Sequence, residues 1–246
     1  MSYVGGKAKC RFIIDILNNP AFDSMDYLEP CVGYGHILRR VVRKRSYTAS
    51  DSHPLLMCLL QAIQERTPLP TEISRDRYNE LRQSDEISVE RGLAAFCYSF
   101  NGKCFAGYCP TYRRRNGRID DMVKSRMNYY KSLQGSEAFQ KATLGCCDFS
   151  CHTPSDKLVY ADPPYRGTQG YGAPFDHERF WETMVEWSKG NIVLVSEYSA
   201  PADWMCIGQE AKKSTLAGGD KQTNRLEKLW IHSTALERVP FLGRNE

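Results

Sequence analysis

The sequence lacks any apolar run long enough to cross a membrane. The longest apolar stretch near the N-terminus, Phe12 to Leu17, is interrupted by Asp15 and is too short for the core of a signal peptide. Internal repeats and low-complexity segments are also missing. We therefore expect a protein of the cytosol or nucleoid without a membrane partner. Its 246 residues suit one α/β domain that carries a sizeable insertion.

Metal-binding signatures are also scarce. The ten cysteines form no C-x-x-C pair, and no histidine lies at zinc-finger spacing from two of them. The tightest group is Cys146, Cys147 and Cys151, with His152 beside it. This group leaves a metal site open, but the sequence favours reduced, mostly buried thiols and no metal. The net charge of +4 permits an anionic partner without requiring one.

The chain opens with an alternation of strands and helices. We expect, in order, a strand over Asp26–Pro30, a helix that Gly33 and Gly35 open and that ends near Arg43, a strand over Ser46–Ala49 that stops at Asp51, and a helix from Pro54. Such an alternation is typical of a parallel sheet that is covered by helices.

This alternation breaks from about Arg66 to Gln134, where Arg, Tyr, Gly and Asn are frequent. Within this stretch we expect helices near Ile87–Phe100 and Asp120–Leu133. The α/β pattern then resumes, with strands at Lys157–Ala161, Ile192–Val195 and Leu226–Ile231 and a helix at Phe175–Lys189. The segment 67–134 is therefore predicted to be an insertion between two parts, 1–66 and 135–246, of one catalytic domain.

The tetrapeptide Asp162-Pro163-Pro164-Tyr165 follows directly on a buried strand, where open α/β sheets bind their ligands. An exocyclic amine on an aromatic base is a poor nucleophile, because its lone pair is delocalised into the ring. The Asp162 carboxylate and the Pro163 carbonyl can each accept one N–H and so localise that lone pair, while Tyr165 offers a flat face for stacking. Positioning and electrostatics would then drive attack on a sulfonium methyl. Alone, the tetrapeptide fits a rigid turn equally well.

A second motif, Glu29-Pro30-Cys31-Val32-Gly33-Tyr34-Gly35, occupies the first strand-to-helix turn. Its glycines let the backbone pass close to a ligand, and a helix N-terminus attracts negative charge. The motif is not G-x-G-x-x-G, which argues against an ordinary dinucleotide fingerprint. Asp51, at the tip of the second strand, is placed to hold ribose hydroxyls. The alternative for Asp51 is a role at the start of the next helix.

The order of these motifs resembles that of the adenine-specific DNA methyltransferases of the Dam-like class, often written D12. The features that carry the resemblance are Tyr3-Val4-Gly5-Gly6-Lys7, Glu29–Gly35, Asp51, Asp148-Phe149 and Asp162–Tyr165, with Phe100–Tyr108 and Ser196–Pro201 similar to phage-type members. The resemblance implies a Rossmann-like S-adenosylmethionine-dependent methyltransferase sheet with a mainly helical target-recognition insertion. It also implies methyl transfer to N6 of a flipped adenine in double-stranded DNA.

Residue roles follow from the same resemblance. Asp162, Pro163 and Tyr165 would carry catalysis. The cofactor site would be lined by Tyr3, Gly6, Lys7, Glu29, Pro30, Cys31, Gly33, Gly35, Asp51, Asp148 and Phe149. Two positions depart from the family pattern: Cys31 replaces a common aromatic residue, and Tyr34 replaces a small one. Both departures could reshape the rim of the cofactor pocket without removing a required group.

Within the insertion, the strongest basic cluster is Arg113-Arg114-Arg115-Asn116-Gly117-Arg118. We expect it to contact phosphates, with one arginine reading guanine in the major groove. Asn101 and Asn116 could read adenine, and Lys103 is a weaker candidate. The alternative is a solvated surface loop. The nearby tyrosines fit helix packing better than base stacking, and His36 and His177 fit local structural roles.

Other substrates and another class of protein remain as alternatives. Cytosine-amine enzymes usually carry Ser, and glutamine-modifying enzymes Asn, where this chain has Asp162. RNA stays open as a substrate, because the sequence contains no direct discriminator. A DNA-binding regulator without catalysis is the alternative from a different class, and the intact Asp162 and glycine turn speak against it. The chain identifies neither a recognition sequence nor a partner nuclease.

Overall fold

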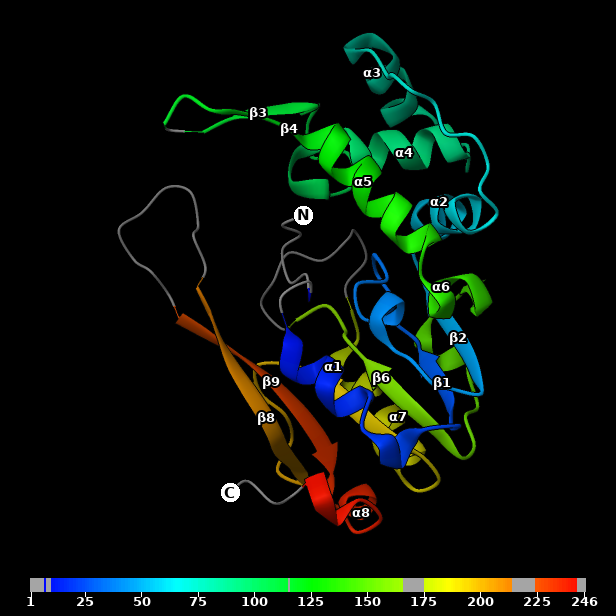
Figure 1. Cartoon of the computed structure of the whole chain (residues 1–246), viewed down its shortest axis with the longest axis vertical. Coiled ribbons are helices and arrows are strands. Elements are labelled where there is room, and N and C mark those ends of the chain that lie inside the picture. Colours follow the sequence, from blue (N-terminus) through cyan, green and yellow to red (C-terminus); the bar gives the residue numbers. More distant parts are fainter. Residues whose placement is uncertain (1–6, 8–9, 115, 166–174, 214–223, 243–246) are drawn as a thin grey trace.

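A seven-stranded sheet forms the centre of the computed structural model, which describes residues 7, 10–114, 116–165, 175–213 and 224–242 (Figure 1). The strand order is β5-β2-β1-β6-β7-β9-β8. The first five strands pair in parallel, and β9 pairs antiparallel with both β7 and β8. The strands are β1 Asp26–Glu29, β2 Ser46–Asp51, β5 Thr143–Cys146, β6 Lys157–Ala161, β7 Ile192–Ser196, β8 Trp204–Lys213 and β9 Asn224–His232.

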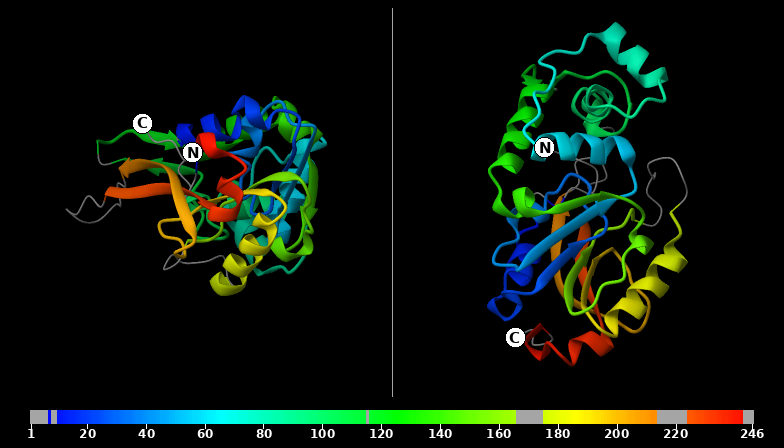
Figure 2. Two further views of the ribbon diagram at one scale, coloured as in Figure 1. Left: turned by 90° about the horizontal axis from the view of Figure 1, so that it is seen from below. Right: turned by 90° about the vertical axis from the view of Figure 1, so that its right-hand side faces the viewer.

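Helices cover both faces of this sheet, because successive residues of its strands point to opposite sides. On β6, Leu158 and Tyr160 belong to the larger core cluster, which includes buried residues of α1 (Arg11–Leu17). Val159 and Ala161 belong to a second cluster under α7 (His177–Ser188). Figures 1 and 2 show α1 and α7 on opposite faces. The central strands are thus buried on both sides, as a parallel sheet requires.

A helical lobe lies beyond one end of the sheet (Figures 1 and 2). It consists of α2 (Pro54–Gln64), α3 (Arg75–Gln83), α4 (Val89–Cys97) and α5 (Met122–Gln134), from which the hairpin of β3 (Thr111–Arg113) and β4 (Ile119–Asp121) projects. Helix α2 packs against α4 and α5 and also against β2 and β5, so it joins the lobe to the sheet. Gly92 permits the close α2–α4 approach, since an added Cβ would lie 2.7 Å from the Leu55 carbonyl oxygen.

Side-chain caps fix where most of the longer helices begin. The cap residue's side-chain oxygen accepts a hydrogen bond from the backbone N–H three residues later, at α3, α4, α5, the short α6 (Glu137–Lys141) and α7. Each cap satisfies one helix-end donor and contributes about 1 kcal/mol. The cap residues are Ser74, Ser88, Asp121, Ser136 and Asp176.

The strands and helices expected outside the insertion are largely confirmed, but the helix expected from Gly33 to Arg43 is wrong. Only a 3-10 turn at Leu38–Arg40 forms there. Gly33 and Gly35 have φ angles of +50° and +69°, which no right-handed helix contains. The chain instead makes a tight turn in which the Gly35 N–H donates to the Val32 carbonyl.

Several elements were not predicted from the sequence. They are α1, α3, α6, α8 (Ser233–Leu236), β5, β8 and the β3–β4 hairpin. The two hairpin strands have three residues each, too few for alternation to show. The insertion is therefore mainly helical, as expected, but it also carries a two-stranded arm. Within the described residues, no helix is both long and apolar enough to cross a membrane.

Candidate active site

The sheet order reverses between β1 and β6, and this is where the chemistry-bearing residues meet. The two strands are parallel neighbours, with Leu28 opposite Val159. Their carboxyl ends therefore lie side by side, and the residues that follow, Pro30 and Asp162, leave from the same edge. In open α/β sheets this position is the usual ligand crevice.

Four side chains form a buried network at that edge. The Nζ of Lys7 lies 2.5 Å from Oδ1 of Asp162 and 2.5 Å from the Tyr165 hydroxyl. The Tyr165 hydroxyl in turn donates to Oε1 of Glu227, and the same Oε1 lies 3.1 Å from Lys7 Nζ. Lys7 and Glu227 are 2% and 1% exposed, whereas Asp162 is 23% exposed. Asp162 is thus the member of the network that a substrate can reach.

The Tyr165 ring does not form an open surface on which a base could stack. Its side chain is buried, Lys7 Nζ lies 4.5 Å from its ring centre, and the Tyr198 ring packs edge-on at 4.6 Å. Burial, with the Asp162 and Glu227 carboxylates beside it, raises the pKa of Tyr165 well above its usual value. The phenol therefore stays protonated and can donate to Glu227.

The turn that contains Gly33 and Gly35 is fixed by two acids. Asp51 accepts hydrogen bonds from the Gly33 N–H and the His53 N–H, each at 3.0 Å, so it serves both the turn and the start of α2. Glu29 accepts from the Tyr27 hydroxyl at 2.7 Å and from the Leu38 N–H. Burial raises the pKa of Asp51 and raises that of Glu29 well above its usual value.

Asp148 and Phe149 follow β5, the strand beside β2. Phe149 is buried and packs against the rings of Phe175 and Phe180, so it belongs to the core under α7. Asp148 caps the short turn after it by accepting from the Ser150 N–H at 3.1 Å. The structure places this pair two strands further from Asp162 than the glycine turn, because β5 lies beyond β2 and β1 in the sheet.

The expectation of reduced thiols throughout is wrong for one pair, because Cys147 and Cys151 form a disulfide. The bond spans the turn that contains Asp148 and Phe149. His152 lies beside it, with Nε2 2.7 Å from the Ser50 hydroxyl. The two sulfurs and His152 lie within 4.8 Å of one another, which is the composition of a metal site, but here the sulfurs bond each other. The other eight cysteines are free.

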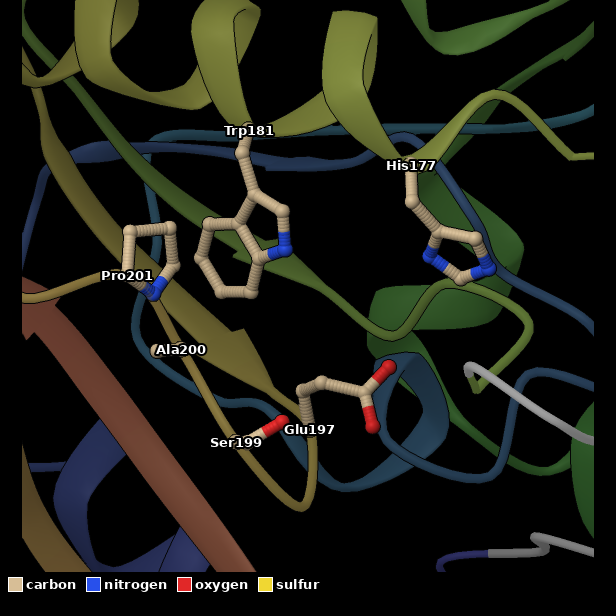
Figure 3. A pocket seen from close by; sticks show the side chains of 6 residues that line it. All are labelled: His177, Trp181, Glu197, Ser199, Ala200 and Pro201. Atoms are coloured by element: carbon tan, nitrogen blue, oxygen red, sulfur yellow. The ribbon is translucent and has the colours of Figure 1, made fainter.

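A pocket of about 240 Å³ adjoins the buried network (Figure 3). His177 and Trp181 from α7 line one side, and Glu197, Ser199, Ala200 and Pro201 from the segment after β7 line the other. The Glu197 backbone carbonyl accepts from the Trp230 indole at 2.8 Å, which fixes this segment against β9. Tyr198, between two lining residues, contacts Tyr165, so the pocket and the network share a wall.

Residues 3–183, more than half of the chain, match the sequence model of the D12 class N6 adenine-specific DNA methyltransferases. The chain belongs to this family. It is therefore an adenine-specific DNA methyltransferase, with S-adenosylmethionine as methyl donor and DNA as substrate. A comparison with curated proteins found no match.

Solved structures to which the chain is similar include methyltransferases. The rRNA methyltransferase aviRa from Streptomyces viridochromogenes is 13% identical, with a TM-score of 0.42 over 97% of this chain and 88% of that chain. The putative methyltransferase yhhF from Escherichia coli is 10% identical, with a TM-score of 0.38 over 91% and 84%. When the hairpin strands β3 and β4 are left out and the other seven strands are renumbered in chain order, the sheet of this methyltransferase has the order 3-2-1-4-5-7-6. This is a doubly wound arrangement with one antiparallel strand.

The candidate residues of the methyltransferase are only partly brought together. Lys7, Asp162 and Tyr165 are in contact, and Glu29, Gly33 and Asp51 surround one turn. Tyr3 and Gly6 lie outside the described residues. Glu227 was missed by the sequence reasoning, because nothing in the pattern of β9 marks an acid as buried. It also lies beyond the stretch that matches the family model.

The basic cluster of the insertion forms the β3–β4 hairpin. Arg114 and Arg118 both pair with Asp120 across it, at 3.0 Å for Arg118, and Arg114 is the main cause of the lowered pKa of Asp120. Arg113 is exposed and has no ion pair with any residue that the structure describes. Arg115 lies outside the described residues. The Asn116 side chain accepts from the Arg118 N–H at 3.2 Å.

The two remaining candidates lie in the loop before the hairpin. Asn101 has a φ of +52° and is half-buried, as is Lys103. The loop that carries them is closed by the Phe100 N–H, which donates to the Gly107 carbonyl at 2.8 Å. The described candidates for DNA contact thus lie in two places, Asn101 and Lys103 in a closed loop and the basic cluster in a projecting arm.

Proposed function

We propose that this enzyme methylates N6 of an adenine flipped out of double-stranded DNA, and that the reaction takes place at Asp162. One observation carries the proposal: Lys7 places an N–H donor 2.5 Å from Oδ1 of Asp162, the position that a substrate amine would take. Asp162 is the exposed member of an otherwise buried network. The ammonium therefore marks a hydrogen-bonding position at Asp162 that the substrate's amino group can take.

Glu227 allows a substrate amino group to replace Lys7 at Asp162. When an adenine amino group replaces Lys7 at Oδ1, Lys7 keeps Glu227 as a partner, 3.1 Å away in the same network. No buried charge is left unpaired, which would cost about 3–5 kcal/mol. Among the described members, two carboxylates face one ammonium, so the site carries a net negative charge that favours a sulfonium nearby.

The residues around the glycine turn fit S-adenosylmethionine. An atom added at the Cβ position of Gly33 would meet nothing within 4 Å, so the space over the turn is open. Glu29 would hold the amino group of the methionine part, and Asp51 would hold the ribose through acceptor positions that Gly33 and His53 leave over. When bound, the cofactor supplies an electrophilic methyl group on a cationic sulfur.

Asp162 and the Pro163 carbonyl then act on the amine. Each accepts one N–H, which localises the nitrogen lone pair and orients it toward the methyl group. The lone pair forms the new N–C bond while the sulfur keeps the electrons of the bond that breaks. The surplus proton passes to Asp162, which is exposed enough to return it to water.

We further infer that residues 67–134 hold the duplex while 1–66 and 135–246 form the catalytic part. The hairpin projects from the lobe and carries Arg113 without an ion pair among the described residues, whereas Asp120 engages Arg114 and Arg118. Among the hairpin arginines that the structure describes, Arg113 is therefore the one that can neutralise a phosphate at least cost. Replacing Arg113 by alanine should reduce the salt dependence of DNA binding by about one ion, whereas Arg114→Ala should first loosen the hairpin.

The decisive test uses purified enzyme, duplex DNA and tritiated S-adenosylmethionine. Label should appear in N6-methyladenine, and Asp162→Ala should abolish it while the variant still folds, as a cooperative unfolding transition shows. Asp85→Ala, at an exposed aspartate of the helical lobe, is the matched control and should keep full activity. Label in cytosine, or in RNA supplied as a competitor, would overturn the proposal.

A further inference from the structure

Tyr34 stands between the two glycines of the turn, but its side chain points into the helical lobe. It is 3% exposed, and its hydroxyl donates to the Gly102 carbonyl at 2.6 Å. Its ring packs edge-on against Phe96 of α4, with ring centres 5.8 Å apart. One residue of the turn is thus anchored in the insertion by both its ring and its hydroxyl.

A second hydrogen bond runs in the opposite direction. The Tyr129 hydroxyl, on α5, donates to the backbone carbonyl of Tyr34 at 2.8 Å, and the Tyr129 ring also packs on His36 at 4.6 Å. Gly102 is shaped to receive the Tyr34 hydroxyl: its φ is +69°, and an added Cβ would lie 3.2 Å from that oxygen. The turn and the insertion therefore hold each other through complementary contacts.

The far end of this connection is the loop of residues 99–108. Gly102 lies between Asn101 and Lys103, the two candidates for DNA contact in that loop. The loop is closed by the Phe100–Gly107 backbone bond and by a bridge between Ser99 and Tyr108, so it moves as a unit. Phe100 also contacts the ring of Tyr112 on β3, at 6.3 Å. Contacts thus run without a break from the glycine turn to the arm that carries Arg113.

We propose that Tyr34 is a positioning residue that couples the cofactor turn to the DNA-contacting surface of the insertion. This inference rests on the proposed function. A ligand that fixes the conformation of the turn fixes Tyr34, and through Gly102 it fixes the 99–108 loop and the hairpin. By linkage, DNA that orders the loop must strengthen cofactor binding by the same factor. A small side chain at position 34 could not reach Gly102.

The test measures the factor by which DNA strengthens cofactor binding. Calorimetry gives the Kd of S-adenosylhomocysteine, which cannot react, for enzyme alone and for enzyme saturated with a duplex that the wild type labels. The Kd without DNA divided by the Kd with DNA should be at least about five in the wild type. In Tyr34→Phe, which keeps the ring and loses only the hydroxyl, the ratio should fall about fivefold, as expected for one hydrogen bond. Tyr129→Phe should lower it as well.

Tyr47→Phe is the matched control, because it removes a 3.2 Å hydrogen bond that a tyrosine hydroxyl accepts from the Lys44 N–H, at the start of β2 and outside the turn and the insertion. Its ratio should equal that of the wild type, and the unfolding midpoints of all variants should confirm that they fold. A Tyr34→Phe ratio equal to the wild-type value, or a wild-type ratio of one, would overturn the coupling. Failure of the wild type to bind either ligand would instead refute the proposed function.

Discussion

Replacing Glu227 by alanine should destabilise the enzyme far more than removing an exposed partner from a shorter ion pair. Glu227 and Lys7 are 1% and 2% exposed, and their charged atoms are 3.1 Å apart. At an effective dielectric constant of about 20, this separation corresponds to an attraction of about 5 kcal/mol. Loss of one partner from a buried pair costs about 3–5 kcal/mol, because the other charge stays buried.

Asp162 moderates this cost, since Lys7 keeps a second carboxylate at 2.5 Å after Glu227 is removed. We therefore expect about 3 kcal/mol for Glu227→Ala, the lower end of that range. Glu227→Gln should cost less, because its amide oxygen still accepts from the Tyr165 hydroxyl. The control pair is Lys141 and Glu137, only 2.6 Å apart but 65% and 76% exposed, where Glu137→Ala should change stability little because water screens both charges.

Urea unfolding at neutral pH measures the loss of unfolding free energy in Glu227→Ala and in Glu137→Ala, from the midpoint and the slope of each transition. A double variant, Lys7→Met with Glu227→Leu, should be less destabilised than the sum of the two single changes, because neither charge of the Lys7–Glu227 pair stays buried without the other. The reasoning fails if Glu227→Ala costs no more than Glu137→Ala. That result would mean that water reaches the network and screens its charges.

Three further predictions concern other parts of the enzyme. Burial raises the pKa of Glu29 above its value in the unfolded chain, so the ionisation of this carboxyl costs stability as pH rises above the unfolded value. If a cofactor ammonium pairs with Glu29, binding releases a proton, and the affinity for S-adenosylhomocysteine rises with pH. Calorimetry in two buffers of different ionisation enthalpy should detect the released proton. Identical binding heats in the two buffers would contradict the pairing. Alkylation of the unfolded, unreduced enzyme should modify eight cysteines, because Cys147 and Cys151 are bonded to each other, and alkylation of the reduced enzyme should modify ten. Modification of ten cysteines in the unreduced enzyme would disprove the disulfide. Gly92→Ala should cost about 1–3 kcal/mol, since its Cβ would lie 2.7 Å from a carbonyl oxygen of α2, whereas Gly190→Ala has open space and should change stability little.

The central strands and α7, which covers one face of them, were predictable from the sequence because their signals are local. Lys157–Ala161 and Ile192–Val195 are short apolar runs bounded by polar residues, and both are buried strands in the structure. The motif at Asp162 could likewise be located, because it consists of consecutive residues at a strand end. The helix expected after Gly33 failed, since the positive φ angles of two glycines depend on the hydrogen bonds that Asp51 and Val32 make with the turn.

Sequence by itself determined which residues end the parallel strands, and so where in the chain the chemistry lies, because strand period and motif order are carried by neighbouring residues. Tertiary structure alone decided which distant groups meet there. Lys7 and Asp162 are 155 residues apart, and Glu227 reaches them only because β9 turns back antiparallel beside β7. The role proposed for Tyr34 likewise depends on the hydrogen bond from its hydroxyl to the Gly102 carbonyl. Contacts of this kind depend on strand order and helix packing, which no local pattern encodes.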